Sequence, residues 1–175
     1  MGFDLNKLIV GKVWKFGDSI ETDAINPYYK YPSMDELKLH TMEAYRPEFP
    51  KQVKAGDILV AGRNFGCGSS RPGLVLREVG IAAIVVESAA RLFFRNSISR
   101  AIPIFVAPGI AGIVDDGDVL EVDYPAGLVR NPVNGKSVTI RKFPSMIEEI
   151  FRAGGLPEFA KKRFDAEAAA SAGKQ

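Results

Sequence analysis

Two hydroxyl groups and a guanidinium stand together at Ser69, Ser70 and Arg71, shortly after two glycines, Gly66 and Gly68. A guanidinium can bind a carboxylate through two parallel hydrogen bonds. Glycines let the backbone turn tightly and approach a ligand closely. The spacing therefore predicts a site for an anion such as a carboxylate, and a purely structural glycine turn is an equally good interpretation of it.

The flanking segments predict that this turn joins a strand to a helix. Residues 57–61 form an apolar run typical of a buried strand, and residues 74–79 are typical of a helix. Pro72 suits the first helical position, which would place Ser70 or Arg71 at the N-cap. The N–H groups and the positive dipole end of that helix would then strengthen an anion site.

The two common phosphate-binding glycine motifs do not occur at this turn. Gly66 and Gly68 are followed by Arg71 and not by the third glycine of a dinucleotide fingerprint. No Gly-Lys-Ser or Gly-Lys-Thr follows either, so the phosphate-loop pattern is missing. A nucleotide-binding domain is therefore disfavoured.

The remaining pattern predicts further strands and helices around this unit. Residues 80–86 are a second apolar run, which would form a parallel βαβ unit with the strand before the turn. Ser33 and Glu36 form a capping box at the start of a helix. Further strands are expected at 8–16, 101–106, 119–123 and 137–141, a polar turn and a short strand at 17–25, a hairpin turn at 134–135, and helices at 87–97 and from a capping pattern at Ser145 to 153.

Length and composition indicate a globular protein of ordinary type. The chain has 175 residues, 46% hydrophobic and 25% charged, with a net charge of +2. This length suggests one domain, and so small a charge without a basic run argues against a nucleic-acid partner. No apolar stretch reaches the roughly 20 residues of a membrane helix, and the first residues lack the pattern of a signal peptide. We therefore expect a cytoplasmic protein with no membrane partner.

The chain contains one cysteine, Cys67, and one histidine, His40. An iron–sulfur cluster or a structural zinc site needs three or four such ligands, so this chain cannot hold either alone. A nucleophile pair of Cys67 with His40 would need a third, orienting group. The simpler interpretation is that His40 is a solvated helix residue and that Cys67 is a small residue allowed by the tight turn.

Residues 64–71, Asn-Phe-Gly-Cys-Gly-Ser-Ser-Arg, resemble the signature of the small, swivelling subunit of the aconitase superfamily. The most similar type is the 3-isopropylmalate dehydratase small subunit, and residues 17–25 and 88–96 agree with it. The resemblance implies an α/β fold, a single swivelling β/β/α domain of the aconitase C-terminal-domain type. This domain would span residues 1–164, with a frayed tail at 165–175.

Members of this family are hydro-lyases that dehydrate a malate-type hydroxy dicarboxylic acid and rehydrate it at the neighbouring carbon, as in leucine biosynthesis. The resemblance implies that Ser69 removes the carbon-bound proton and that Ser70 and Arg71 bind a substrate carboxylate. The backbone of the turn and its anion site would come from Asn64, Gly66, Cys67 and Gly68. The partner would be a large subunit carrying an iron–sulfur cluster, and this chain would bind no cofactor.

The loop Tyr28-Tyr29-Lys30 resembles the substrate-specificity loop of the family, and a tyrosine-rich surface loop is the alternative. Lysine would present a point charge where relatives often carry the fork of an arginine. The substrate could thus be 3-isopropylmalate or a related dimethylmalate, citramalate or homoaconitate type of acid.

Other segments leave two roles open. Asp18, Thr22 and Asp23 would shape the turn through bonds to the backbone or, less simply, take part in catalysis. Arg91 and Arg95 fall on one helix face and would pair with the partner's surface or bind an anion. Residues 72–73, Pro-Gly, replace the Glu and His or Gln of many relatives, which favours the alternative of a binding module without catalysis.

Overall fold

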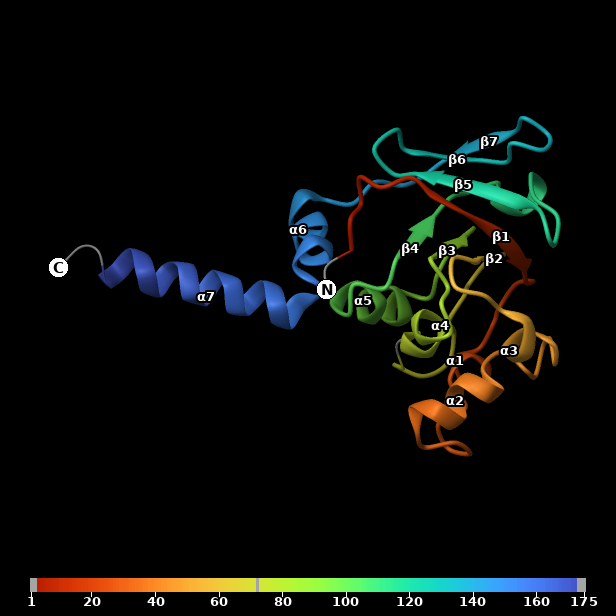
Figure 1. Ribbon diagram of the computed structural model, residues 1–175, viewed down its shortest axis with the longest axis horizontal. Helices are drawn as coiled ribbons and strands as arrows, with labels where there is room; N and C mark the ends of the chain where they lie inside the picture. The colour runs from red at the N-terminus through yellow and green to blue at the C-terminus, as the bar shows by residue number, and fades with distance from the viewer. Residues whose placement is uncertain (1–2, 72, 173–175) are drawn as a thin grey trace.

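The computed structural model describes residues 3–71 and 73–172, the side chains to residue 168. Its centre is a mixed sheet of seven strands in the order β4-β3-β2-β1-β5-β6-β7 (Figure 1). The first four of these are parallel to one another, and β1, β5, β6 and β7 are antiparallel. The strands are β1 Ile9–Lys15, β2 Ile58–Ala61, β3 Ala83–Val86, β4 Ile104–Val106, β5 Val119–Asp123, β6 Leu128–Arg130 and β7 Ser137–Thr139.

Seven α-helices and one 3-10 turn accompany the sheet in the described residues. The helices are α1 Thr22–Ile25, α2 Met34–His40, α3 Phe49–Gln52, α4 Leu74–Glu78, α5 Arg91–Ser99, α6 Ser145–Ala153 and α7 Leu156–Ala172, and the 3-10 turn is η1 Ile110–Gly112. None of these helices is long and apolar enough to cross a membrane.

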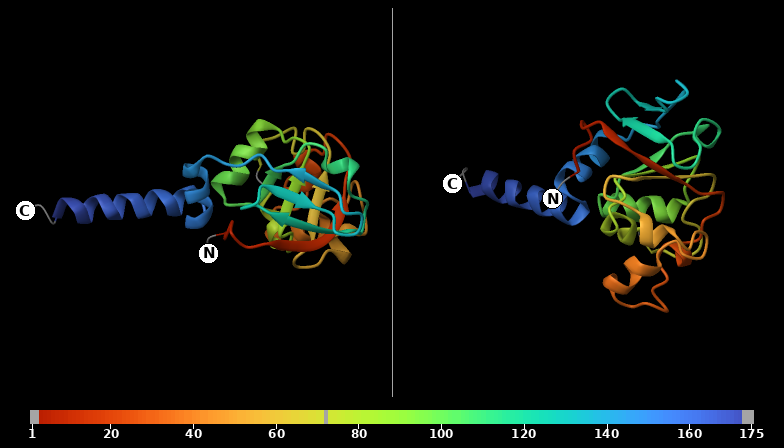
Figure 2. Two further views of the ribbon diagram at one scale, coloured as in Figure 1. Left: turned by 90° about the horizontal axis from the view of Figure 1, so that it is seen from above. Right: turned by 45° about the vertical axis from the view of Figure 1, so that its right-hand side comes forward.

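Strands β2 and β3 are buried on both faces, which explains their continuous apolar runs. In β2, Ile58 and Val60 belong to one core cluster, and Leu59 and Ala61 belong to the other. The first cluster also contains residues of β5 and β6, so the antiparallel half of the sheet covers that face (Figure 2). The second cluster contains residues of α2, α3, α4 and α5. The layers are therefore β/β/α, as the family resemblance implies.

Several expected elements are confirmed and some differ. The unit β2–α4–β3 is present with β2 and β3 parallel, and Ser33 and Glu36 form the capping box at α2. Residues 22–25 form the short helix α1 and not a strand, because Thr22 and Ile25 both turn inward, a spacing of three that suits a helix. The capping pattern at Ser145 is wrong, since Pro144 is the N-cap of α6 and its side chain makes no cap hydrogen bond.

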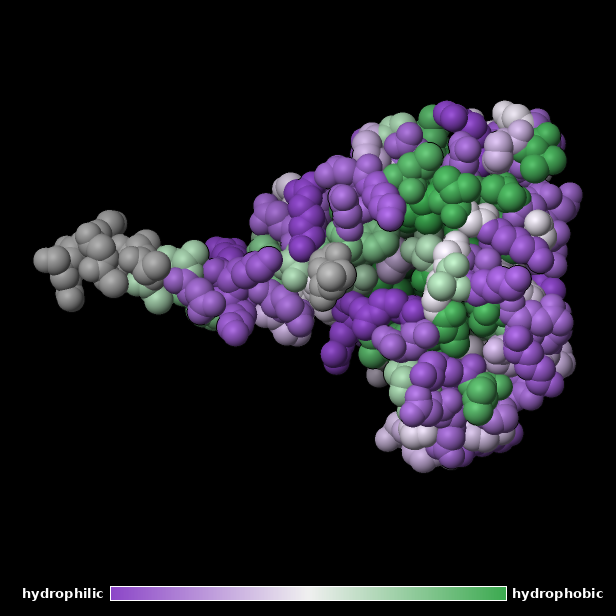
Figure 3. Space-filling view, in the orientation of Figure 1, coloured by the Kyte–Doolittle hydropathy of each residue, from purple (hydrophilic) through white to green (hydrophobic). Residues whose placement is uncertain are grey.

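The surface is mostly hydrophilic on the face that Figure 3 shows, and hydrophobic residues gather there over β1 and β5. Leu8, Val10 and Val119 in and beside these strands are 41–51% exposed. Helix α7 projects away from the body and is hydrophilic along much of its length (Figures 1 and 3).

Helix α7 continues into the segment expected to be a frayed tail. It reaches Ala172, and the alanine-rich composition of this end favours a helix. Near its start, Phe159 packs against a core cluster, whereas residues 161–168 are exposed. The contacts of α7 with the body therefore come from its first turns, and the domain boundary at residue 164 stays a prediction.

Deleting residues 165–175 is expected to change the free energy of unfolding by less than about 0.5 kcal/mol, as for other exposed surface changes. Denaturant unfolding of the full and shortened chains would measure the difference. A loss of more than about 2 kcal/mol would contradict the boundary, because it would need buried contacts from this segment.

Candidate active site

The segment between β2 and α4 is a loop whose backbone takes three left-handed conformations. Asn64, Gly66 and Gly68 have φ angles of 57°, 76° and 103°. Such angles are rare for most residues, are tolerated by asparagine and cost glycine nothing. We call residues 63–71 the motif loop. Gly66 and Gly68 therefore allow the tight turn, as the sequence predicts.

One side of the motif loop is bound by the segment after β1. Asp18 Oδ1 accepts a hydrogen bond from the N–H of Arg63 at 2.6 Å, and the carbonyl of Ile20 accepts one from the N–H of Gly66 at 2.8 Å. The N–H of Thr22 donates to the carbonyl of Cys67 at 2.8 Å. Asp18 thus shapes the turn through a bond to the backbone, as the sequence predicts.

The other side of the motif loop is bound by the start of α5 and the residues before it. The N–H of Phe65 donates to the carbonyl of Ser88 at 3.0 Å, and the carbonyl of Phe65 accepts from Ala90 at 2.9 Å. The amide of Asn96 on α5 donates to the carbonyl of Ser70. The motif loop therefore lies between two segments that each bind its backbone.

Ser69 is held by Thr22. The N–H of Ser69 donates to Thr22 Oγ1 at 2.8 Å, and the two side-chain oxygens are 3.0 Å apart. Thr22 is only 1% exposed, whereas Ser69 is half-buried and Ser70 is exposed. The hydroxyl of Ser69 thus lies at the protein surface, and the buried side chain of Thr22 binds the backbone N–H of the same residue.

Arg71 is oriented by two residues from the same region as Thr22. Its guanidinium lies 3.1 Å from Asp23 Oδ1, and its centre lies 5.6 Å from the centre of the Tyr28 ring. An ion pair this exposed contributes little stability, but together with the ring it limits the directions that the guanidinium can take. The structure therefore places Arg71 beside Tyr28, and it binds Ser69 to Thr22, the residue before the partner of Arg71.

Tyr29 and Lys30 lie beside this place and face a cavity of about 270 Å³. The cavity also has Asp23, the partner of Arg71, in its wall. Tyr29 is 64% exposed, and the Nζ of Lys30 is 6.0 Å from the centre of its ring. Asp23 connects these two residues to the motif loop, because it lines the same cavity and pairs with Arg71.

The model of the aconitase C-terminal domain matches residues 9–107. This chain belongs to the aconitase C-terminal domain family. The 3-isopropylmalate dehydratase small subunit of Thermodesulfovibrio yellowstonii is 44% identical over 163 residues, which cover 91% of this chain and 97% of that protein.

Two further relatives agree with this family. The isopropylmalate/citramalate isomerase small subunit of Methanocaldococcus jannaschii is 43% identical, with 91% of this chain and 97% of that protein covered. The crystal structure of a 3-isopropylmalate dehydratase from the same organism superposes with a TM-score of 0.85 at 36% identity, covering 94% of this chain and 99% of that chain. The resemblance stated from residues 64–71 is confirmed.

The N-cap predicted for helix α4 is wrong. Helix α4 begins at Leu74 with Gly73 as N-cap, so neither Ser70 nor Arg71 is at the cap. Pro72 lies outside the described residues. Helix α4 still begins at Leu74, where the pattern at 74–79 predicts it, so only the cap differs. Because α4 has only five residues, its dipole would add little to the anion site expected from the sequence.

Cys67 and His40 have separate partners. Cys67 Sγ lies 3.7 Å from the carbonyl of Ile20. The ring of His40 stacks on Tyr31 with centroids 3.7 Å apart, and its Nδ1 is 2.6 Å from Glu43. These contacts argue against a nucleophile pair, but His40 is half-buried and not the solvated helix residue that the sequence predicts. No group of three or more metal-ligating side chains lies together in the described residues.

Two residues of α5 that support the motif loop were not singled out as site residues from the sequence. The ring of Phe93 lies beneath Gly66, and the amide of Asn96 binds the carbonyl of Ser70. The match of residues 88–96 to the family is the signal that could have identified them. Arg91 and Arg95 on the same helix are exposed and make no ion pair within the part of the chain that the structure describes.

Proposed function

We propose that this chain is the small subunit of a heteromeric hydro-lyase that acts on a malate-type hydroxy dicarboxylic acid, with 3-isopropylmalate as the first substrate to test. The observation that carries the proposal is the pair of Ser69 and Arg71, each held by a neighbouring residue of α1, in a chain that small subunits of such enzymes match over nine-tenths of its length. The reaction would place it in leucine biosynthesis, in the cytoplasm.

In this proposal Ser69 is the base and Arg71 and Ser70 bind a carboxylate. In its alkoxide form, the oxygen of Ser69 takes the proton from the substrate carbon and becomes a neutral hydroxyl. The electron pair of the broken C–H bond forms a double bond, and hydroxide leaves from the neighbouring carbon. The guanidinium of Arg71 would bind a carboxylate through two parallel bonds and so fix that carbon beside Ser69. Its place beside the ring of Tyr28 supports such a fixed orientation.

The partner is a large subunit with an iron–sulfur cluster. The one cysteine and one histidine of this chain cannot ligate a cluster, so that group must come from another chain. When bound there, the cluster would act as a Lewis acid on the departing hydroxyl and on a carboxylate. This chain supplies the base, the carboxylate ligands and the backbone that holds them.

The substrate would be selected at the cavity beside Tyr29 and Lys30. This cavity adjoins Asp23 and hence Arg71, so one end of a substrate bound at Arg71 could extend toward it. Its wall carries Lys30, whose charge would favour an acid with a further polar or charged group. Citramalate, dimethylmalate and homoaconitate types of acid therefore stay alternatives to 3-isopropylmalate.

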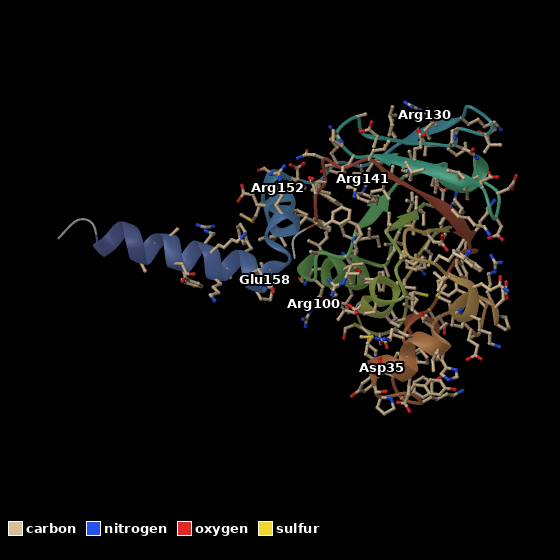
Figure 4. The ribbon with its side chains drawn as sticks, in the orientation of Figure 1. Asp35, Arg100, Arg130, Arg141, Arg152 and Glu158 are labelled. Atoms are coloured by element: carbon tan, nitrogen blue, oxygen red, sulfur yellow. The ribbon has the colours of Figure 1, made fainter. Side chains whose placement is uncertain are left out.

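Arg71→Lys is expected to lower kcat/KM by about 10- to 100-fold, mainly through a higher KM, because a point charge replaces a charge-assisted, two-bond contact. Arg130→Lys is the matched control. Arg130 is exposed and pairs with Glu121 at 3.7 Å, and Figure 4 shows it at the opposite side of the body from Asp35 of α2. An Arg71→Lys enzyme with unchanged KM would contradict the carboxylate role.

The function is tested by mixing this chain with its large subunit without oxygen and offering a panel of malate-type acids. Formation of the unsaturated product is followed by ultraviolet absorbance. Turnover that needs both chains supports the proposal, and the best acid identifies the substrate. A stable complex without turnover of any acid would instead favour the binding module that residues 72–73 suggest.

A further inference from the structure

We propose that Thr22 is a positioning residue whose hydroxyl donates a hydrogen bond to Ser69 Oγ and keeps this oxygen ready to accept a proton. The inference rests on the proposed role of Ser69 and adds a residue outside the motif loop to it. Thr22 lies 47 positions before Ser69 in the chain, and its hydroxyl oxygen is 3.0 Å from the oxygen of Ser69 that is proposed to take the proton.

The direction of the hydrogen bond follows from burial. Thr22 Oγ1 already accepts the N–H of Ser69 at 2.8 Å. The side chain is 1% exposed, so its hydroxyl hydrogen cannot bond to bulk water, and a buried donor left unpaired is costly. Within the described residues, Ser69 Oγ at 3.0 Å is the acceptor that the hydroxyl of Thr22 contacts. Thr22 is therefore the donor of this pair.

This arrangement leaves the proton of Ser69 free to point away from Thr22. A hydroxyl that receives a hydrogen bond directs its own hydrogen elsewhere, and for Ser69 the open side is the surface where a substrate would lie. A donor aimed at Ser69 Oγ also stabilises the negative form of this oxygen over the neutral form. The N–H of Ser69 polarises the hydroxyl of Thr22 in turn, which strengthens that donation.

The backbone around Thr22 keeps its hydroxyl in this place. The N–H of Thr22 is bound to the carbonyl of Cys67 at 2.8 Å. Gly68 has φ +103°, and a Cβ built there would lie 3.1 Å from Thr22 Oγ1, a contact tight enough that the hydroxyl would have to shift. Glycine at 68 therefore lets the hydroxyl of Thr22 reach the turn beneath Ser69.

Asp23, the residue after Thr22, orients Arg71, the other side chain proposed to act on the substrate. Thr22 binds Ser69, and Asp23 lies 3.1 Å from the guanidinium of Arg71. Two consecutive residues of α1 thus orient the base and the carboxylate ligand of the motif loop. We infer that α1 sets the distance between proton removal and carboxylate binding.

The test compares Thr22→Val with Thr22→Ser in the assembled two-subunit enzyme. Valine keeps the shape and removes the hydroxyl, so kcat is expected to fall by about 100-fold, the cost of one lost donor to a developing oxyanion, with KM within threefold of wild type. The pH at which kcat is half-maximal should move upward, because the negative form of Ser69 loses a donor. Serine keeps the hydroxyl and should restore kcat to within about fivefold.

A merely structural role would give another result. Thr22→Val would then lower assembly or thermal stability while kcat per assembled enzyme and its pH profile stay at wild-type values, and this outcome would overturn the inference. If the valine variant does not fold, Thr22→Ala removes the same hydroxyl with less crowding, and the same loss of kcat is expected.

A second readout in this chain alone separates this inference from the proposed function. The amide hydrogen of Ser69 should exchange with solvent at least tenfold faster in Thr22→Val than in wild type, and near the wild-type rate in Thr22→Ser. Equal exchange in all three would overturn the inference even if turnover were seen. If the wild-type enzyme turns over no acid, the function is wrong, and the exchange rates still decide whether Thr22 holds Ser69.

Discussion

Ser69→Ala is expected to lower kcat by about 1,000-fold in the assembled enzyme, because it removes the group proposed to take the carbon-bound proton. The KM should change little, since the carboxylate ligands Ser70 and Arg71 remain. The hydroxyl of Thr22 would lose its acceptor, but the backbone bond from Ser69 to Thr22 Oγ1 would persist. The loop should therefore keep its conformation. Steady-state kinetics with the large subunit measure kcat and KM separately.

The control for this variant is Ser137→Ala. Ser137 is an exposed residue of β7, at the far edge of the sheet from β2, so its replacement should leave both constants unchanged. Assembly with the large subunit, measured by gel filtration, should be the same for both variants. If Ser69→Ala kept more than about a tenth of the wild-type kcat, Ser69 would not be the base.

The parallel part of the fold was predictable because its signals are local. Strands β2 and β3 are buried on both faces, so each is a continuous apolar run in the sequence. Such a run predicts a strand without information from distant residues. The capping box at Ser33 is likewise contained in four residues. These elements follow from neighbouring residues alone.

The rest of the site depends on residues that are distant in the sequence. The pattern at 17–25 does not show that Thr22 lies beneath Ser69 or that Asp23 pairs with Arg71, since both contacts form only after β1 and β2 align. The cap of α4 was predicted wrongly for the same reason. Local propensity favours a helix start near Pro72, but the hydrogen bonds of the motif loop to the segments on its two sides hold the preceding residues in a loop.

Gly66→Ala is expected to lower the free energy of unfolding by about 3 kcal/mol, the sum of a left-handed residue with a Cβ and overpacking of a buried site. Gly66 has φ +76°, and a Cβ built there would lie 2.2 Å from Cγ of Phe93. That ring cannot retreat easily, because Phe93 is fully buried and also contacts Phe65 with centroids 5.3 Å apart. Denaturant unfolding measures the loss.

The same change should lower activity, because Phe93 and Asn96 lie on one helix. A shift of Phe93 would move α5, whose Asn96 binds the carbonyl of Ser70, and with it the residues beside Ser69. Gly17→Ala is the control: Gly17 is exposed, has no positive φ and has no atom within 4 Å of a built Cβ, so its loss should stay within about 0.5 kcal/mol. Equal unfolding energies for the two variants would show that the motif loop can relax away from Phe93. In that case the placement of Ser69 would depend on Thr22 and on the hydrogen bonds of the motif loop to the segments on its two sides.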